Sequence, residues 1–193
     1  MDLTFRPATK EDTPPVLALV RSAYRGESSR AGWTTEADLV ADERISDSSL
    51  LAKITDPAGV VLLAYSSSGT STGTSTPASV SDSGRDPRLV GCCEVGRRDD
   101  DRAYFGLFAV SPELQAAGIG RQVLQRAEEY AKQEWGSRLM NMWVIWTREE
   151  LISWYIRRGY RRTEEKAPFP YSELVNGKAL RNDLHFIVLE KEL

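Results

Sequence analysis

The stretch Phe108-Ala-Val-Ser-Pro-Glu-Leu-Gln-Ala-Ala-Gly-Ile-Gly-Arg121 decides the fold of this 193-residue chain. It begins inside an almost wholly apolar run, residues 104–110, which is typical of a central strand covered on both faces. Ser111 and Pro112 end that run, and apolar residues then recur at helical spacing from residue 118 to residue 135. The stretch therefore predicts a buried strand, a glycine-containing turn and an amphipathic helix.

The turn between this strand and helix is suited to bind an anion. The first four N–H groups of a helix have no intrahelical partner, and the helix dipole adds roughly 0.3–1 kcal/mol for a negative charge at that end. Gly118 and Gly120 let the backbone approach phosphate oxygens without interference from a Cβ atom, and Arg121 adds a cation. Taken alone, the glycines are explained equally well by a sharp bend with no ligand.

The segments around this stretch predict an α/β fold, in which helices flank a mixed sheet. The helix that follows the next strand has the clearest ends, because Thr147-Arg-Glu-Glu150 matches a capping box and Gly159 is a typical stop. Strands are expected at residues 3–6, 60–65, 89–96, 139–146, 160–163 and 185–189, and further helices from about residue 13 to residue 24, from 34 to 45 and from 48 to 54.

Length and composition favour one domain over residues 1–193. Its strands are interrupted at about residues 66–87 by a segment made almost entirely of Ser, Thr, Gly and Pro, which predicts a flexible low-complexity insertion. A tolerated surface insertion is the simpler interpretation, because long loops cost little free energy, and a regulatory loop is the alternative.

Charge and residue usage exclude several functional classes. The net charge of -3 argues against a nucleic-acid-binding protein, and no apolar run approaches the ~18 residues that a membrane span requires. The N-terminal residues show no targeting segment, and the adjacent Cys92 and Cys93 fit a reducing compartment, so we expect a cytoplasmic protein. A single histidine, His185, argues against a metal site and against a Ser-His-Asp triad.

Two motifs in the order found here resemble the GNAT superfamily of acyltransferases. F-A-V-S-P-E-L-Q-A-A-G-I-G-R, residues 108–121, is similar to the strand, cofactor loop and helix of that family, and W-Y-I-R-R-G-Y, residues 154–160, is similar to its later helix-strand motif. The resemblance is specific over about residues 89–162. It implies the GNAT fold, an N-acetyltransferase, and acetyl-CoA as the cofactor.

The resemblance also implies where coenzyme A binds. The backbone of residues 108–110 would pair with the pantetheine arm while the next strand splays away, and N–H groups of residues 115–121 would hold the pyrophosphate. Arg148 stands where relatives often carry an asparagine that contacts the cofactor. The cofactor-binding residues implied in this way are Phe108, Ala109, Val110, Gln115, Ala116, Ala117, Gly118, Ile119, Gly120, Arg121 and Arg148.

Two catalytic residues are expected. The resemblance puts Tyr155 near the cofactor sulfur, where its phenol, with a pKa near 10, can protonate a departing thiolate. Many relatives carry a glutamate on the central strand, but residues 104–110 contain no carboxylate. Glu94, one strand earlier, is our substitute for the general base, acting directly or through water. The alternative for Glu94 is an ordinary charge on the solvent side of a strand.

The expected reaction is direct attack of a primary amine of a small molecule on the thioester. Trp33, Trp143, Tyr171 and His185 are candidates to line the acceptor pocket, with simple packing as the alternative for each. The connection of residues 163–183 is long enough to overhang the acceptor side, which disfavours a protein N-terminus as acceptor. A protein or peptide N-acetyltransferase and a non-catalytic CoA-binding sensor are the competing hypotheses. The identity of the acceptor and the choice between monomer and homodimer stay open.

Overall fold

The computed structural model describes residues 2–66, 87–98 and 101–193. Apart from its two end residues, the low-complexity insertion predicted at residues 66–87 lies outside the described part of the chain. None of the helices within the described ranges is long and apolar enough to cross a bilayer.

Seven strands form one mixed sheet in the order β1-β3-β4-β5-β6-β9-β7, which confirms the predicted α/β class. Neighbouring strands are antiparallel except β5 and β6, which are parallel. A second, two-stranded sheet pairs β2 with β8. The strands are β1 Leu3–Pro7, β2 Val40–Ala41, β3 Gly59–Ser66, β4 Arg88–Arg97, β5 Arg102–Val110, β6 Leu139–Ile145, β7 Arg161–Pro168, β8 Lys178–Ala179 and β9 His185–Glu192.

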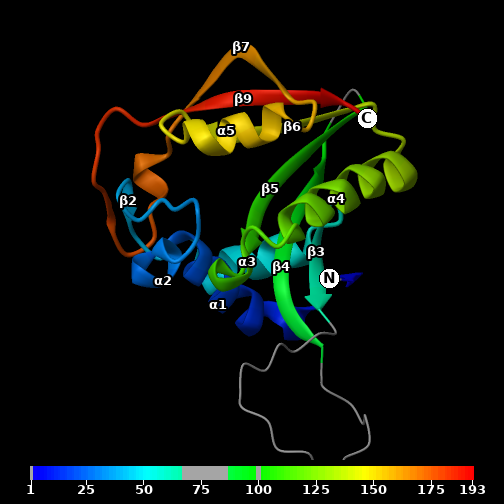
Figure 1. Ribbon diagram of the computed structural model, residues 1–193, viewed down its shortest axis with the longest axis horizontal. Coiled ribbons are helices and arrows are strands. Elements are labelled where there is room, and N and C mark those ends of the chain that lie inside the picture. Colours follow the sequence, from blue (N-terminus) through cyan, green and yellow to red (C-terminus); the bar gives the residue numbers. More distant parts are fainter. Residues whose placement is uncertain (1, 67–86, 99–100) are drawn as a thin grey trace, which may run out of the picture.

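Helices cover both faces of the sheet (Figure 1). Because strand side chains alternate, Leu62 and Ala64 of β3 pack in one core with α4 and α5, whereas Val61 and Leu63 pack in another with α1 and α3. The helices are α1 Thr13–Tyr24, α2 Gly26–Arg30, α3 Asp47–Thr55, α4 Ile119–Trp135 and α5 Glu149–Ile156, with 3₁₀ helices at Lys10–Asp12, Pro112–Leu114 and Tyr171–Glu173.

The sheet opens between β5 and β6. These strands pair only at their first residues, from Arg102 to Tyr104, and then diverge, as Figure 1 shows. Along the other edge of β5, Leu107 and Phe108 together oppose the single residue Cys93, which is a bulge, and Leu107 has a φ of 45°. A bulge bends its strand and increases the local twist, so it directs the end of β5 away from β6.

The helix expected at residues 34–45 is wrong. A short helix, α2, lies before this segment, and residues 31–39 form turns that lead into β2. The segment offers few apolar contacts to a helix. Instead the Glu36 carboxylate binds the guanidinium groups of Arg25 and Arg148, and β2 pairs with β8.

The capping box expected at residues 147–150 is also wrong, because α5 begins one residue later than that motif requires. Arg148 is the N-cap residue and makes no side-chain capping bond. The Thr147 hydroxyl is buried and has no hydrogen-bond partner among the described residues. The predicted stop at Gly159 does hold, with a φ of 93°.

Asp12 connects the first strand to the first helix, and its replacement tests this connection. Its carboxylate accepts hydrogen bonds from Arg6 at 2.6 and 2.7 Å and from the Thr9 N–H at 2.8 Å. The Arg6 guanidinium, opposed by burial, holds the pKa of Asp12 below its usual range. Asp12→Asn should lower the free energy of unfolding at pH 7 by about 1–2 kcal/mol, since Arg6 is partly exposed.

The stabilisation by Asp12 is complete above the carboxyl pKa of the unfolded chain, about 3.9, and is lost as the pH falls toward the lower pKa of the folded chain. Urea unfolding of both proteins should therefore show a difference that shrinks between pH 5 and pH 2.5. Asp2→Asn, at an exposed position, is the control. A difference that is independent of pH would contradict this account.

Candidate functional site

Three neighbouring cavities that share lining residues lie where β5 leaves β6. The α4 cavity, about 180 Å³, lies at the start of α4; the inner cavity, about 70 Å³, lies between β5 and β6; the outer cavity, about 370 Å³, lies under residues 169–175. Tyr24, Phe108, Arg148, Leu151 and Tyr155 line both the α4 cavity and the inner cavity. Glu36, Arg44, Tyr104, Leu107, Ile145 and Phe186 line both the inner and the outer cavity.

The start of α4 presents backbone N–H groups to the α4 cavity. Ala116 and Gly118 have φ values of 72° and 81°, and the N–H of Gln122 donates to the Gly118 carbonyl at 3.3 Å in the first turn. The Gln115 and Ala117 N–H groups already donate to the Pro112 and Leu114 carbonyls, so the natural donors to an anion are the N–H groups of residues 118–121, which precede the regular helix ladder. A Cβ on Gly120 would lie 3.2 Å from the Phe108 ring, so a larger residue would push that ring.

Two arginines beside this turn could bind phosphate. Arg121 and Arg158 both line the α4 cavity, and Arg158 packs 3.5 Å from the centre of the Trp154 ring. The Nε of Arg158 is buried with no hydrogen-bond partner among the described residues. Burial, followed by repulsion from Arg157 and Arg121, lowers the pKa of Arg158. An anion here would supply the missing partner and relieve the repulsion, so these residues fit a phosphorylated cofactor.

Sequence reasoning missed both Trp154 and Arg158. The available signal was the four-residue spacing of Trp154, in the last turn of α5, and Arg158, in the turn that follows α5. Both side chains line the α4 cavity together with Tyr155.

Two side chains hold the end of β5. The Tyr24 hydroxyl donates to the Phe108 carbonyl at 2.7 Å, and the Gln115 amide donates to the Val110 carbonyl at 3.3 Å. Gln115 also accepts a hydrogen bond from the Trp33 N–H at 3.1 Å. Trp33, expected near the acceptor, therefore lies beside the α4 cavity. Tyr24 carried no motif that would have identified it from sequence.

Tyr155 lies at the junction of the α4 and inner cavities. Its side chain is 4% exposed and its ring packs edge-on against Trp154, with centroids 5.0 Å apart. Burial raises the pKa of Tyr155 well above its usual value, so the phenol stays protonated at neutral pH and is a hydrogen-bond donor.

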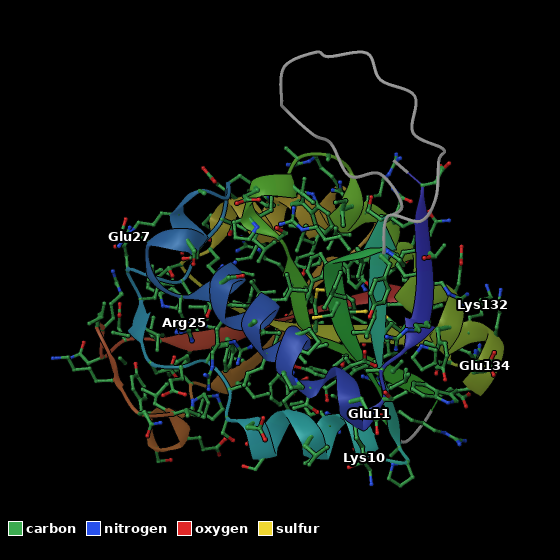
Figure 2. All side chains as sticks on the ribbon, turned by 90° about the horizontal axis from the view of Figure 1, so that it is seen from below. Lys10, Glu11, Arg25, Glu27, Lys132 and Glu134 are labelled. Carbon is green, nitrogen blue, oxygen red and sulfur yellow. The ribbon has the colours of Figure 1, made fainter. Side chains whose placement is uncertain are left out.

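A buried charge cluster forms one wall of the inner cavity. The Glu36 carboxylate accepts hydrogen bonds from Arg25 at 2.8 Å and from Arg148 at 2.5 Å. Burial disfavours the charged form of Glu36, but the guanidinium groups of Arg148, Arg44 and Arg25 outweigh burial and lower its pKa. Arg25 also binds Asp42 at 2.6 Å, and Figure 2 shows Arg25 near α2, at the opposite end of the molecule from Lys132 of α4. The cluster fixes Arg148 at the border of two cavities.

Glu94 lies in a different place from Tyr155. Both oxygens of its carboxylate accept hydrogen bonds from the Lys53 ammonium at 2.8 Å, and the side chain lines the outer cavity. Tyr155 lines the other two cavities. The inner cavity therefore separates the two expected catalytic residues.

The other predicted residues divide into two groups. Trp143 lines the inner cavity and stacks on Phe186. Tyr171, whose hydroxyl accepts the Leu184 N–H, and His185, which stacks on Trp146, are not among the described residues that line the three cavities.

Two residues of the cofactor turn, Ala117 and Ile119, have side chains outside the α4 cavity, the first exposed and the second buried in the core. Within the described ranges, no group of His, Cys, Asp and Glu side chains could hold a metal ion.

Residues 73–160, which contain the α4 turn and Tyr155, match the sequence profile of the Acetyltransferase (GNAT) family. The protein carries a GNAT acetyltransferase domain. It is an N-acetyltransferase, and GNAT acetyltransferases use acetyl-CoA as the acetyl donor. These findings confirm the family, the enzyme class and the cofactor that the two sequence motifs implied. No curated protein sequence gives a significant match.

Solved structures confirm the fold of the chain. A PaiA N-acetyltransferase from Thermoplasma acidophilum, in complex with coenzyme A, is 18% identical with a TM-score of 0.63, over 100% of both chains. A spermidine N-acetyltransferase from Vibrio cholerae, in complex with CoA and spermine, is 16% identical with a TM-score of 0.63, over 98% of this chain and 95% of that chain. The ribosomal-protein-S18-alanine N-acetyltransferase from Escherichia coli is 12% identical with a TM-score of 0.64, over 99% and 94%.

Arg158→Ala tests the assignment of the α4 cavity to the cofactor. The substitution removes a cation whose buried Nε has no hydrogen-bond partner among the described residues. It should raise the KM for acetyl-CoA by roughly tenfold, the value expected for one hydrogen bond to a charged group, and change kcat little. Steady-state kinetics with acetyl-CoA varied would measure the effect. Arg157→Ala, at the adjacent exposed position, is the matched control, and an equal effect of both variants would exclude a specific role.

Proposed function

We propose that this protein transfers an acetyl group from acetyl-CoA to a primary amine of a small molecule by direct attack of the amine on the thioester. The observation that carries the proposal is the position of Tyr155, which lines both the α4 cavity and the inner cavity. Tyr155, a buried proton donor, thus lines both the α4 cavity, which suits a phosphorylated cofactor, and the inner cavity, which shares lining residues with the outer cavity.

Coenzyme A would be held by three sets of groups in the α4 cavity. The N–H groups at the start of α4, together with Arg121 and Arg158, would bind the phosphates, and the backbone of residues 108–110 would pair with the pantetheine arm. Bound acetyl-CoA supplies an acetyl group activated as a thioester. Tyr24 and Gln115 would keep the end of β5 in position through their bonds to the Phe108 and Val110 carbonyls.

The outer cavity supports a small acceptor. Phe169, Pro170, Glu173, Leu174 and Val175 line it, and these residues belong to the connection that follows β7. That connection is held in place by the pairing of β8 with β2. Because this connection covers the outer cavity and is fixed by strand pairing, it would obstruct the entry of an extended protein N-terminus. A protein acceptor is therefore the second hypothesis.

The acceptor amine must lose a proton, because a lysine-like amine with a pKa near 10.4 is neutral only about once in a few thousand molecules at pH 7. We propose that Glu94 accepts this proton through water from its position in the outer cavity. Tyr155 would donate its phenolic proton to the departing sulfur. Glu36 is a poor alternative base, because its lowered pKa and its bonds to Arg25 and Arg148 keep it ionised and occupied.

A non-catalytic CoA sensor is the third hypothesis, and the match to the acetyltransferase family disfavours it. It is motivated by the Lys53 ammonium, which binds both oxygens of Glu94. CoA release across a panel of amines and peptides separates the three hypotheses. Binding of CoA without turnover on any acceptor would favour the sensor, and turnover on peptides alone would favour the protein acetyltransferase.

We further propose one domain over residues 1–193 and a cytoplasmic location. The first and last strands, β1 and β9, belong to the same sheet, which supports a single domain. Cys92 and Cys93 are free and buried, and burial raises the pKa of the Cys92 thiol to about 12. Such thiols are compatible with a reducing compartment.

Tyr155→Phe tests the proton donor while keeping the ring that packs against Trp154 and Phe108. We expect kcat to fall by about 10²–10⁴-fold, with little change in the KM for acetyl-CoA. Because burial raises the pKa of Tyr155, the wild-type kcat should show no loss from ionisation of this residue up to about pH 10. A variant with unchanged kcat would remove Tyr155 from the mechanism.

Glu94→Gln tests the base. If Glu94 accepts the proton, activity at pH 7 should fall by about 10²-fold or more and recover as the pH approaches the pKa of the acceptor amine. The recovery has a simple cause, because a free amine needs no base. Lys53→Met breaks the same ion pair but keeps the carboxylate, so it should retain most of the activity. Loss in Glu94→Gln that high pH fails to rescue would argue against a base.

A further inference from the structure

Arg44 forms no direct ion pair within the described part of the chain, although, against the effect of burial, the Glu36 carboxylate lies close enough to raise its pKa. Its side chain lines both the inner and the outer cavity, and its Nε is buried without a hydrogen-bond partner. The other cations of these two cavities each bind a carboxylate: Arg25 binds Glu36 and Asp42, Arg148 binds Glu36, and Lys53 binds Glu94. Among the described residues, no carboxylate oxygen forms an ion pair with Arg44.

The fold holds Arg44 in this position at a local cost. Its φ is 68°, a left-handed conformation that is uncommon for a residue with a long side chain. The Arg44 N–H donates to the Asp42 carboxylate at 3.0 Å, and the Glu43 N–H donates to the Val175 carbonyl at 2.9 Å. The guanidinium packs 4.8 Å from the centre of the Tyr24 ring. These contacts direct the Arg44 side chain into the cavities.

The charge balance of the inner cavity is incomplete without a ligand. Arg44 and Arg148 face a single carboxylate there, that of Glu36, which also binds Arg25. An unpaired buried cation is unfavourable, and a carboxylate is the anion whose two oxygens best match a guanidinium group. The protein therefore offers a place for one carboxylate from outside the chain.

We infer that Arg44 binds the carboxylate of the acceptor, and that the acceptor is an amino acid acetylated on its α-amine. The inference rests on the proposed function. The inner cavity, about 70 Å³, is lined by both Arg44 and Tyr155, so a carboxylate on Arg44 leaves only a short distance to the amine that reacts near Tyr155. An α-amino acid has one carbon between these groups. Its side chain would extend into the outer cavity of about 370 Å³.

The same arrangement disfavours polyamines. A spermidine-like acceptor would bring a second ammonium group next to Arg44, where like charges repel. The choice between the two acceptor classes therefore depends on this one cation, although several solved structures of similar fold are named as spermidine N-acetyltransferases.

The test pairs acceptors that differ only in the carboxylate. CoA release would be measured with the twenty proteinogenic L-amino acids, with their α-carboxamides, and with spermidine and spermine. We expect turnover of at least one amino acid, with kcat/KM reduced roughly 10- to 100-fold for its carboxamide, as the loss of a charged hydrogen bond predicts. Arg44→Gln should raise the KM of the free amino acid by a similar factor and leave the carboxamide unchanged. Arg44→Lys should recover part of the loss.

Arg102→Gln is the matched control, because it removes the same charge from the distant start of β5, where Arg102 pairs with Glu190. Binding of coenzyme A, measured by calorimetry, verifies that each variant is folded. Equal turnover of acids and carboxamides, or an equal loss on both in Arg44→Gln, would overturn the inference and leave the acetyltransferase proposal standing. Amino-acid binding to the CoA complex that requires Arg44, without any turnover, would overturn the proposed function alone.

Discussion

The separation of β5 from β6 is the constraint on which the rest of the structure depends. Two parallel strands that stayed paired along their length would bury the backbone of β5 in the sheet. Here the bulge at Leu107 and Phe108 bends β5 away after Tyr104, and all three cavities lie along the gap. Backbone groups beyond Tyr104 no longer bond to β6, and two of them, the Phe108 and Val110 carbonyls, accept hydrogen bonds from Tyr24 and Gln115 instead.

Buried charge stabilises this opening from the side of the first helices. Glu36 joins Arg25 to Arg148 and so ties the segment between α2 and β2 to the start of α5. A buried carboxylate that binds two guanidinium groups is sensitive to geometry, because removal of either partner leaves an uncompensated charge. The cluster thus holds in place a wall of the site that has little apolar core of its own.

The sequence pattern predicted those strands, helices and motifs whose structure depends mainly on residues within one short segment. The apolar run before the glycine turn predicted β5, the helical spacing after it predicted α4, and the two motifs together indicated the family and the cofactor. The segment at residues 34–45 was misjudged because its conformation depends on Arg148 and on β8, far along the chain. Tyr24 and Arg44 were missed for the same reason, since each gains its place only from neighbours in space.

The roles of Tyr155 and Glu94 remain predictions. Their positions show that local sequence pattern does not give the distance between side chains on different elements. Both residues lie on the elements expected for them, but the register and bulges of the sheet decide which cavity each side chain lines. Spacing along a strand gives the face of a residue, not its distance from a residue on another element.

The hydrogen bond from Tyr24 to Phe108 spans 84 positions, and the ion pair between Arg148 and Glu36 spans 112. Contacts of such high sequence separation form late, because long loops must close before they contribute. The inner cavity is lined by residues from Tyr24 to Phe186, so its walls are complete only after part of β9 has been synthesised. The order of biosynthesis therefore delays the acquisition of any ligand-binding capacity until most of the polypeptide has been made.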